Sequence, residues 1–176
     1  ANAVYESADA VMLSGETAVG KHPIESVKIM RDILMNTEKE IFEKNTFHKI
    51  SVEVDKDIRS AIGESVKLIS KHLSINAIVV MTQSGSTAII VSHYRPDTNI
   101  FALTPNKNIC NKLSLVWGIY SILIPEYIST DKMIRGAQEV LIENKLLKYE
   151  NNFVLTAGVP VGVTGSTNML KIQTIS

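Results

Sequence analysis

Apolar runs and amphipathic stretches alternate from residue 58 to the end of the chain. Ile58 to Leu73 repeats apolar residues at helical spacing, and further helices are predicted at 86–94, 106–113 and 130–146. Short runs rich in β-branched residues predict strands at 76–81, 99–104, 118–124 and 152–157. This alternation indicates an α/β fold, with a mainly parallel sheet of about five strands flanked by helices. The last segment, 168–175, alternates in polarity and is expected to be an edge strand, antiparallel to its neighbour.

The beginning of the chain carries its own run of elements. Ala10 to Leu13 is a short apolar run, which predicts a strand over 9–13 that is buried on both faces. From Pro23 onward, apolar residues return at helical spacing and predict a helix, because proline suits the first helical turn. Between the strand and the helix we expect a polar loop that contains Ser14, Gly15, Glu16 and Thr17.

Residues 44–57 lack helical periodicity and are mostly polar, which is typical of a connection between domains. The sequence therefore predicts three parts. Residues 1–43 form a strand, loop and helix, residues 44–57 form a linker, and residues 58–176 form a separate α/β domain.

Composition narrows the class of protein. The chain has 176 residues, 45% of them hydrophobic, and its formal net charge is zero. Such a balance gives no reason to expect nucleic-acid binding, and no apolar run reaches the roughly 18 residues that a membrane-spanning helix needs. The single cysteine, Cys110, is compatible with a reducing cytoplasm. The four histidines are scattered without metal-ligand spacing, so we expect no metal site.

One loop of the α/β domain is suited to an anion. It lies between the predicted strand 76–81 and the helix that follows, and it consists of Thr82, Gln83, Ser84, Gly85, Ser86 and Thr87. Glycine lets the backbone approach a ligand closely, the first N–H groups of a helix lack partners within it, and hydroxyls donate hydrogen bonds. Alternatively, Ser84 or Ser86 caps the helix while the other side chains face water. The residues alone leave both interpretations open.

Several segments of the chain resemble a known family. Residues 1–25 include Asp9-Ala10-Val11-Met12-Leu13-Ser14-Gly15-Glu16-Thr17-Ala18, and the resemblance continues through 82–87, Tyr94-Arg95-Pro96 and 157–162. Together they resemble pyruvate kinases of the bacterial type, from the end of the (β/α)8 catalytic barrel through the C-terminal allosteric domain. The resemblance implies a glycolytic, cytoplasmic enzyme that transfers a phosphoryl group from phosphoenolpyruvate to ADP, giving pyruvate and ATP, with Mg²⁺ (or Mn²⁺) and K⁺.

The resemblance also implies an effector site. In the family, the loop matching 82–87 holds a phosphate of an allosteric activator, and a second effector loop corresponds here to 160–166, with Gly162, Thr164, Gly165 and Ser166. Neither loop contains Lys or Arg, unlike those of enzymes that respond to fructose 1,6-bisphosphate. Lys132 is a possible cation, although a solvated helix charge is the plainer interpretation. We therefore expect AMP or ribose 5-phosphate to be favoured over fructose 1,6-bisphosphate.

The resemblance implies that the catalytic groups lie before Ala1, so the chain is expected to be inactive and to hold no cofactor. The loop 14–17 would then only border the active site. The family forms tetramers, and for this chain we expect a dimer through the C-terminal domain. The alternative is a free-standing phosphate-binding or small-molecule-binding α/β domain without a kinase parent.

Overall fold

The computed structural model describes residues 1–44, 57–162 and 167–175, and contacts divide the chain into two units, 1–50 and 51–176. Of the linker predicted at 44–57, all but the two end positions lie outside the described residues.

A single sheet of five strands organises the larger unit, in the order β3-β2-β1-β4-β5. The strands are β1 (Ala77–Met81), β2 (Ile100–Thr104), β3 (Ile119–Leu123), β4 (Asn152–Gly158) and β5 (Thr167–Thr174). The first four pair in parallel, whereas β5 runs antiparallel to β4 at the edge. The predicted α/β class, with its parallel strands and antiparallel edge strand, is confirmed.

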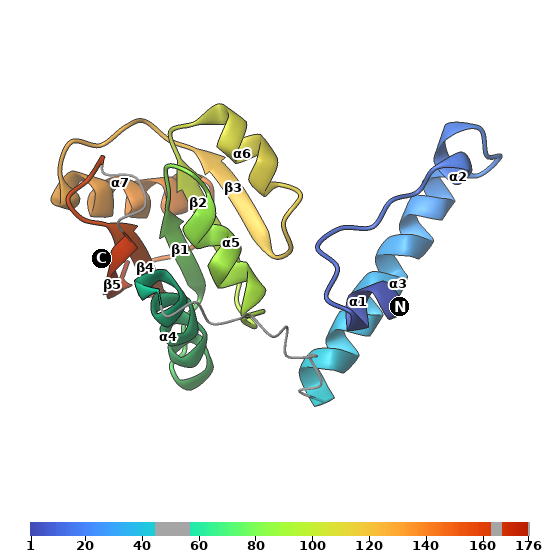
Figure 1. Ribbon diagram of the computed structural model, residues 1–176, viewed down its shortest axis with the longest axis horizontal. Coiled ribbons are helices and arrows are strands. Elements are labelled where there is room, and N and C mark those ends of the chain that lie inside the picture. Colours follow the sequence, from blue (N-terminus) through green and yellow to red (C-terminus); the bar gives the residue numbers. More distant parts are fainter. Residues whose placement is uncertain (45–56, 163–166, 176) are drawn as a thin grey trace. The chain divides into compact units, whose positions relative to one another are not determined.

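Helices cover both faces of this sheet, because the central strands bury their side chains on both sides (Figure 1). The helices of this unit are α4 (Ile58–His72), α5 (Ser86–His93), α6 (Lys107–Leu113) and α7 (Thr130–Glu143). Val79, Phe101 and Leu155 point to the core that includes Met133 and Leu141 of α7. Their neighbours along the strands point to the other core, which includes residues of α4, α5 and α6 such as Val66, Val91 and Leu113.

Side chains at the helix ends explain where the helices begin. Asp57 accepts from the Arg59 amide at the start of α4, Asn106 accepts from the amides of Asn108 and Ile109 in α6, and Ser129 accepts from the Lys132 amide in α7. The Arg59 side chain, followed by its amide, also holds the pKa of the Asp57 carboxyl below its usual range.

Helix α7 ends earlier than the predicted residue 146. Lys145 has a φ of 56°, and the amides of Leu146 and Leu147 both return to the Leu141 carbonyl oxygen at 2.9 and 3.2 Å. This turn satisfies the open carbonyl end of the helix and stops its extension.

The strand order creates a crevice at one edge of the sheet. The chain leaves β1 through α5 on one face to reach β2, whereas the connection from β3 to β4 runs through α7 on the other face. Connections therefore diverge between the adjacent strands β1 and β4. In open α/β sheets, ligands usually bind in the crevice that such a divergence leaves outside the carboxyl ends of the strands.

The regular elements among the described residues of the smaller unit are helices. They are α1 (Asn2–Tyr5), α2 (Gly15–Ala18) and α3 (Pro23–Lys44). Tyr5 Oη donates to Glu40 Oε2 at 3.1 Å and joins α1 to α3. The predicted helix from Pro23 is confirmed.

The prediction of a strand over 9–13 is wrong, and so is the prediction that this segment is buried on both faces. These residues form no strand, Val11 and Met12 are exposed, and the polar residues that follow begin the short helix α2 instead of a loop. A strand requires backbone hydrogen bonds to a neighbouring strand, and no described residue pairs with this segment. An apolar run alone does not provide that neighbour.

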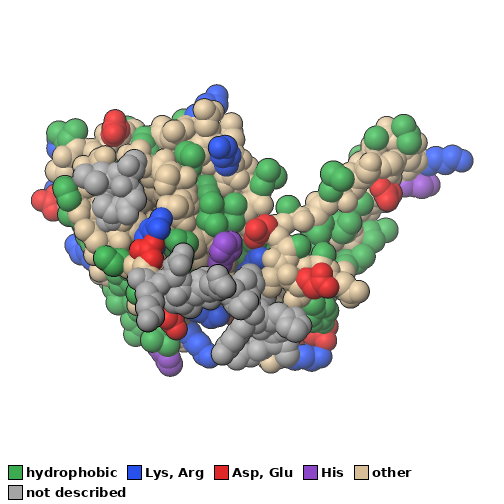
Figure 2. Space-filling view, in the orientation of Figure 1, with side chains coloured by type: hydrophobic (Ala, Val, Ile, Leu, Met, Phe, Trp, Pro, Cys, Tyr) green, Lys and Arg blue, Asp and Glu red, His purple; other side chains and the backbone are tan. Residues whose placement is uncertain are grey.

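Apolar side chains remain exposed on this smaller unit, as the green patches along α2 and α3 in Figure 2 show. They include Met12 at 84% and Val19 at 89% exposure, together with Ile24, Val27, Ile29 and Met35 on α3. A lone helix of 22 residues with two short companions cannot bury these side chains.

Candidate functional site

A pocket of about 600 Å³, part of it open to solvent, lies at the crevice between β1 and β4. Residues from the ends of four parallel strands meet there, because the carboxyl ends of parallel strands share one edge of the sheet. Three segments provide its polar walls: the loop 82–87 after β1, residues 124–127 after β3, and residues near both ends of the connection between β4 and β5.

The loop 82–87 carries the hydroxyl-rich wall. Thr82, Gln83, Ser84, Ser86 and Thr87 line the pocket. Ser84 Oγ lies 3.0 Å from Ser86 Oγ, and both side chains are at least partly accessible. The sequence identifies the six residues 82–87 as a candidate anion-binding loop, and five of them line the pocket.

Gly85, the sixth residue, shapes the loop. Its φ of 85° lies in the left-handed region that favours glycine, and its amide donates to Thr82 Oγ1 at 2.9 Å. A Cβ at this position would lie 3.2 Å from Ile109 Cγ2 and from Leu113 Cδ2 of α6. The turn therefore favours glycine, and a side chain here would also press on the two α6 side chains.

The amides in the first turn of α5 have no side-chain cap. Its N-cap is Gly85, which has no side chain to accept from the first helical amides, and Ser86 N lies 3.5 Å from Ser84 Oγ, at the long limit for a hydrogen bond. Uncapped amides at a helix N-terminus favour an anion. The capping alternative is therefore supported only by this one long contact.

Thr87 and Thr167 connect the two sides of the crevice. Thr87 Oγ1 and Thr167 Oγ1 lie 2.5 Å apart, although 80 residues separate them in the sequence. Close by, the Asn168 side chain accepts from the Val159 amide at 2.9 Å and donates to the Val159 carbonyl at 2.7 Å. These bonds hold together the two ends of the connection between β4 and β5. Gly162 lines the pocket, whereas Thr164, Gly165 and Ser166 lie outside the described residues.

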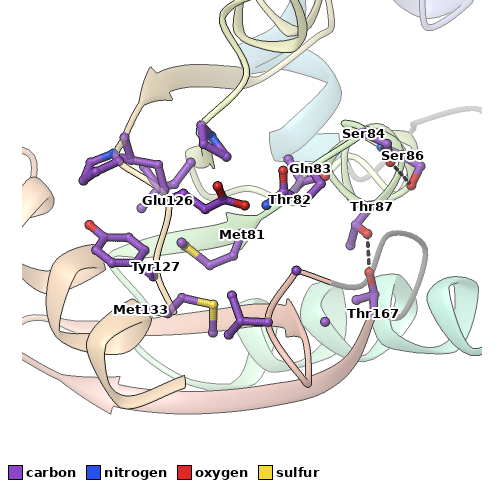
Figure 3. Close-up of a pocket in the computed structure, with 17 residues that line it drawn as sticks. Met81, Thr82, Gln83, Ser84, Ser86, Thr87, Glu126, Tyr127, Met133 and Thr167 are labelled. Carbon is purple, nitrogen blue, oxygen red and sulfur yellow. Dashed lines mark hydrogen bonds between the residues drawn. The ribbon is translucent and has the colours of Figure 1, made fainter. Parts of the chain in front are cut away.

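A third wall was not foreseen from the sequence. Glu126, Tyr127 and Met133 lie opposite Ser84 and Ser86 in Figure 3. The sequence did contain an indication of this wall, because residues 124–127 lie at the end of the predicted strand 118–124 and must therefore reach the same edge of a parallel sheet. What the sequence could not give was the strand order that places them across from the loop 82–87.

Tyr127 is fixed by a glycine on α7. A Cβ at Gly136 would overlap Tyr127 Oη, so the ring packs directly on the helix backbone. Burial, with smaller contributions from the charges of Glu139 and Glu143, raises the pKa of the Tyr127 phenol above its usual range. The phenol is therefore neutral at physiological pH.

The charges around the pocket are few. Among its described lining residues, Glu126 is the single charged side chain. Lys132, the cation suggested by the sequence, is exposed in the first turn of α7 and does not line the pocket, although its neighbour Met133 does. In the described parts of the chain, no group of three or more His, Cys, Asp or Glu residues is arranged to hold a metal ion.

The polar residues near the start of the chain belong to the other unit. Glu16 Oε2 accepts from the Ser14 amide at 3.1 Å, and Thr17 Oγ1 donates to the Ser14 carbonyl at 3.2 Å. Hydrogen bonds from the Glu16 and Ser14 amides lower the pKa of the Glu16 carboxyl. Glu16 thus acts as an acceptor at the start of α2, where Gly15 is the first helical residue.

The strand order and the position of the pocket define a doubly wound α/β domain with a pocket at its switch point. The model of the family described as pyruvate kinase, alpha/beta domain, matches residues 60–173. The chain belongs to the pyruvate kinase family.

Individual relatives agree with this assignment. The chain is 42% identical over 176 residues to a pyruvate kinase of Geobacillus stearothermophilus, and 41% identical over 177 residues to one of Lactobacillus delbrueckii subsp. bulgaricus. These alignments cover 100% and 99% of this chain but 30% of each relative, so the chain spans less than a third of their length.

A solved structure gives the same result. The crystal structure of a pyruvate kinase from Cryptosporidium parvum superposes with a TM-score of 0.86 at 27% identity, covering 99% of this chain and 34% of that one. Family membership favours a pyruvate kinase part over a free-standing phosphate-binding domain.

Proposed function

We propose that the chain is the C-terminal regulatory part of a pyruvate kinase and that its pocket binds a phosphorylated effector. The intact enzyme would transfer a phosphoryl group from phosphoenolpyruvate to ADP in the cytoplasm. Family membership and the share of its relatives that the chain spans support the first statement. The pocket at the start of α5 carries the second. None of the described helices is both long and apolar enough to cross a membrane.

The phosphate would bind where hydroxyls and backbone amides converge. Ser84 and Ser86 can each donate from their hydroxyls, and the amides of the first turn of α5 point outward at the positive end of the helix dipole. Such a site binds phosphate without a lysine or arginine. The glycine at the N-cap position allows the close approach that a phosphate group requires.

Ligands with one phosphate fit this pocket better than those with two. No described lining residue is cationic, and residues 163–166 contain no Lys or Arg. A second phosphate would therefore enter the pocket without a charged partner. AMP and ribose 5-phosphate are the proposed effectors, in preference to fructose 1,6-bisphosphate.

The chain alone would not catalyse phosphoryl transfer. That reaction depends on metal-bound carboxylates and on cationic side chains that neutralise the transferring group. The described residues offer no cluster of metal ligands, so Mg²⁺ and K⁺ would bind to other parts of the intact enzyme. Ser14 to Thr17 would border the active site there. The exposed apolar side chains of α3 support packing of this unit against further elements of a (β/α)8 barrel.

Subunit contact is the other proposed role. The intact enzyme would be a tetramer, and the chain by itself a dimer formed through residues 58–176. Light scattering at tens of micromolar protein would give the mass of a dimer. A monomer at that concentration would contradict this part of the proposal.

Calorimetry tests the effector site. AMP, ribose 5-phosphate and fructose 1,6-bisphosphate are titrated into the wild type, into Ser84→Ala and into Ser65→Ala. Ser65 lies on an exposed part of α4, where its hydroxyl bonds to the Ala61 carbonyl, so it is a matched serine outside the pocket. We expect Ser84→Ala to weaken binding of the monophosphates by about tenfold, the value of one hydrogen bond to a charged group. Equal binding by all three proteins would refute the site.

A further inference from the structure

We propose that Glu126 is the residue that makes this pocket select phosphorylated sugars or nucleosides with one anionic group. This inference rests on the proposed binding of a phosphate at the loop 82–87, and it adds a selectivity determinant from a different part of the fold. Glu126 comes from the connection after β3, on the wall opposite the hydroxyl-rich loop.

The position of Glu126 is fixed by its neighbours on both sides. Ile124 is buried, and its amide donates to the Thr104 carbonyl at 3.1 Å, so the backbone still follows β2 at this point. On the other side, the Tyr127 ring packs against the backbone of Gly136 in α7. The short segment between these two anchors also contains Pro125, whose ring restricts φ. The carboxylate is thus presented from a well-defined stretch of chain.

The side chain is directed at the pocket. Figure 3 shows the Glu126 carboxylate turned toward the side on which Thr82 and Gln83 lie. It is accessible to solvent, and it is the single charged side chain among the described lining residues. An ionised carboxylate only accepts hydrogen bonds, so its natural partners are hydroxyl and amino groups of a ligand.

The negative charge of Glu126 then distinguishes monophosphates from bisphosphates. A sugar monophosphate places its anionic group at the start of α5 and leaves hydroxyls free to donate across the pocket to Glu126. A bisphosphate brings a second anion toward the same carboxylate, with no described lysine or arginine lining the pocket to compensate. The second phosphate of a bisphosphate therefore finds no cationic partner among the described lining residues, and the Glu126 carboxylate repels it.

The test measures the ratio of two dissociation constants, fructose 1,6-bisphosphate over ribose 5-phosphate, by calorimetry on the full chain. We compare the wild type, Glu126→Gln and Glu64→Gln. The control removes the same charge from an exposed position on α4 outside the pocket. We expect the ratio to fall by about tenfold in Glu126→Gln and to stay unchanged in Glu64→Gln. A general effect of net charge acts more strongly on the bisphosphate than on the monophosphate, and Glu64→Gln is the variant that measures it.

A second measurement needs no variant. The ratio in the wild type should fall as salt is raised from about 0.02 M to about 0.3 M, because salt screens repulsion between charges that face solvent. An unchanged ratio in Glu126→Gln, with ribose 5-phosphate still bound in a Ser84-dependent way, would overturn the role of Glu126 and leave the proposed effector site intact. If the wild type binds neither ligand, or binds both independently of Ser84, the effector site fails and this inference fails with it.

Discussion

Thr87 Oγ1 and Thr167 Oγ1 form a buried hydrogen bond of 2.5 Å between the first turn of α5 and the first residue of β5. Thr87 is 3% exposed and Thr167 is 7% exposed, yet both line the pocket. The bond therefore links the end of the loop 82–87 to the far end of the connection between β4 and β5. The pair thus joins two walls of the pocket.

A double-mutant cycle on Thr87→Val and Thr167→Val measures the strength of this link. Each single variant leaves one buried hydroxyl without its partner, and we expect a loss of about 1–2 kcal/mol in the free energy of unfolding. The double variant should lose less than the sum, because no hydroxyl is then left unpaired. Urea unfolding followed by the fluorescence of Trp117 gives the values. Simple additivity would mean that the two hydroxyls do not interact.

Thr156 gives a contrasting prediction. Its hydroxyl lies in β4 at 0% exposure and has no hydrogen-bond partner among the described residues. Replacement by the isosteric valine removes an unsatisfied polar group, so Thr156→Val should be neutral or more stable by about 1 kcal/mol. The same urea experiment decides it. A loss of stability similar to that of Thr87→Val would contradict the structure at this position.

Arg95 and Trp117 form a cation–π pair, with the guanidinium carbon 4.5 Å from the ring centroid. Arg95 is only 5% exposed, so its charge is largely removed from solvent. Arg95→Met keeps an aliphatic chain over the ring but removes the charge. We expect a loss of about 1–2 kcal/mol and a change in tryptophan emission. Arg135→Met, at an exposed position of α7, is the control and should change neither. Unaltered emission in Arg95→Met would argue against the contact.

Gly136→Ala tests how Tyr127 is held. The new methyl group would displace the Tyr127 ring from α7, with an expected cost of about 1–3 kcal/mol and weaker effector binding. Gly15→Ala is the matched change at a helical glycine with open space around it, and it should be neutral or slightly stabilising. Chemical unfolding and calorimetry report the two effects. Full stability in Gly136→Ala would mean that the ring packs elsewhere.

The Tyr127 phenol also predicts a dependence on pH. Burial raises its pKa in the folded state above the usual value near 10, whereas the unfolded chain has the ordinary value. Its contribution to stability is therefore fully present below about pH 10 and is lost as the pH rises through the folded pKa. Difference titration of tyrosinate absorbance between the wild type and Tyr127→Phe isolates this group. Titration at or below the ordinary value would contradict its burial.

Local pattern was sufficient for much of the larger unit. Strands such as 77–81 are continuous apolar runs because both faces are covered, and the loop 82–87 stands out because glycine and hydroxyl residues separate a strand from a helix. The segment 9–13 has a similar apolar run, but none of the described strands pairs with it, so the same rule failed there. Strand pairing is a long-range property that a run of apolar residues does not contain.

The candidate site likewise combines residues that local sequence identifies with residues that only the strand order brings together. Thr82 to Thr87 could be selected from consecutive residues, whereas Glu126 and Tyr127 reach the pocket only through the strand order, which places β3 and β1 on either side of β2. Lys132 was considered for its charge, but the position of α7 leaves it exposed and outside the lining. Charge and residue type identify candidates, and topology decides which of them meet.

A crystal structure of the chain soaked with ribose 5-phosphate tests the central claim most directly. The phosphate should lie at the start of α5, within hydrogen-bond distance of the hydroxyls of the loop 82–87, with the sugar extending toward Glu126. A saturating soak that leaves this loop empty, or that places the phosphate elsewhere on the chain, would contradict the account.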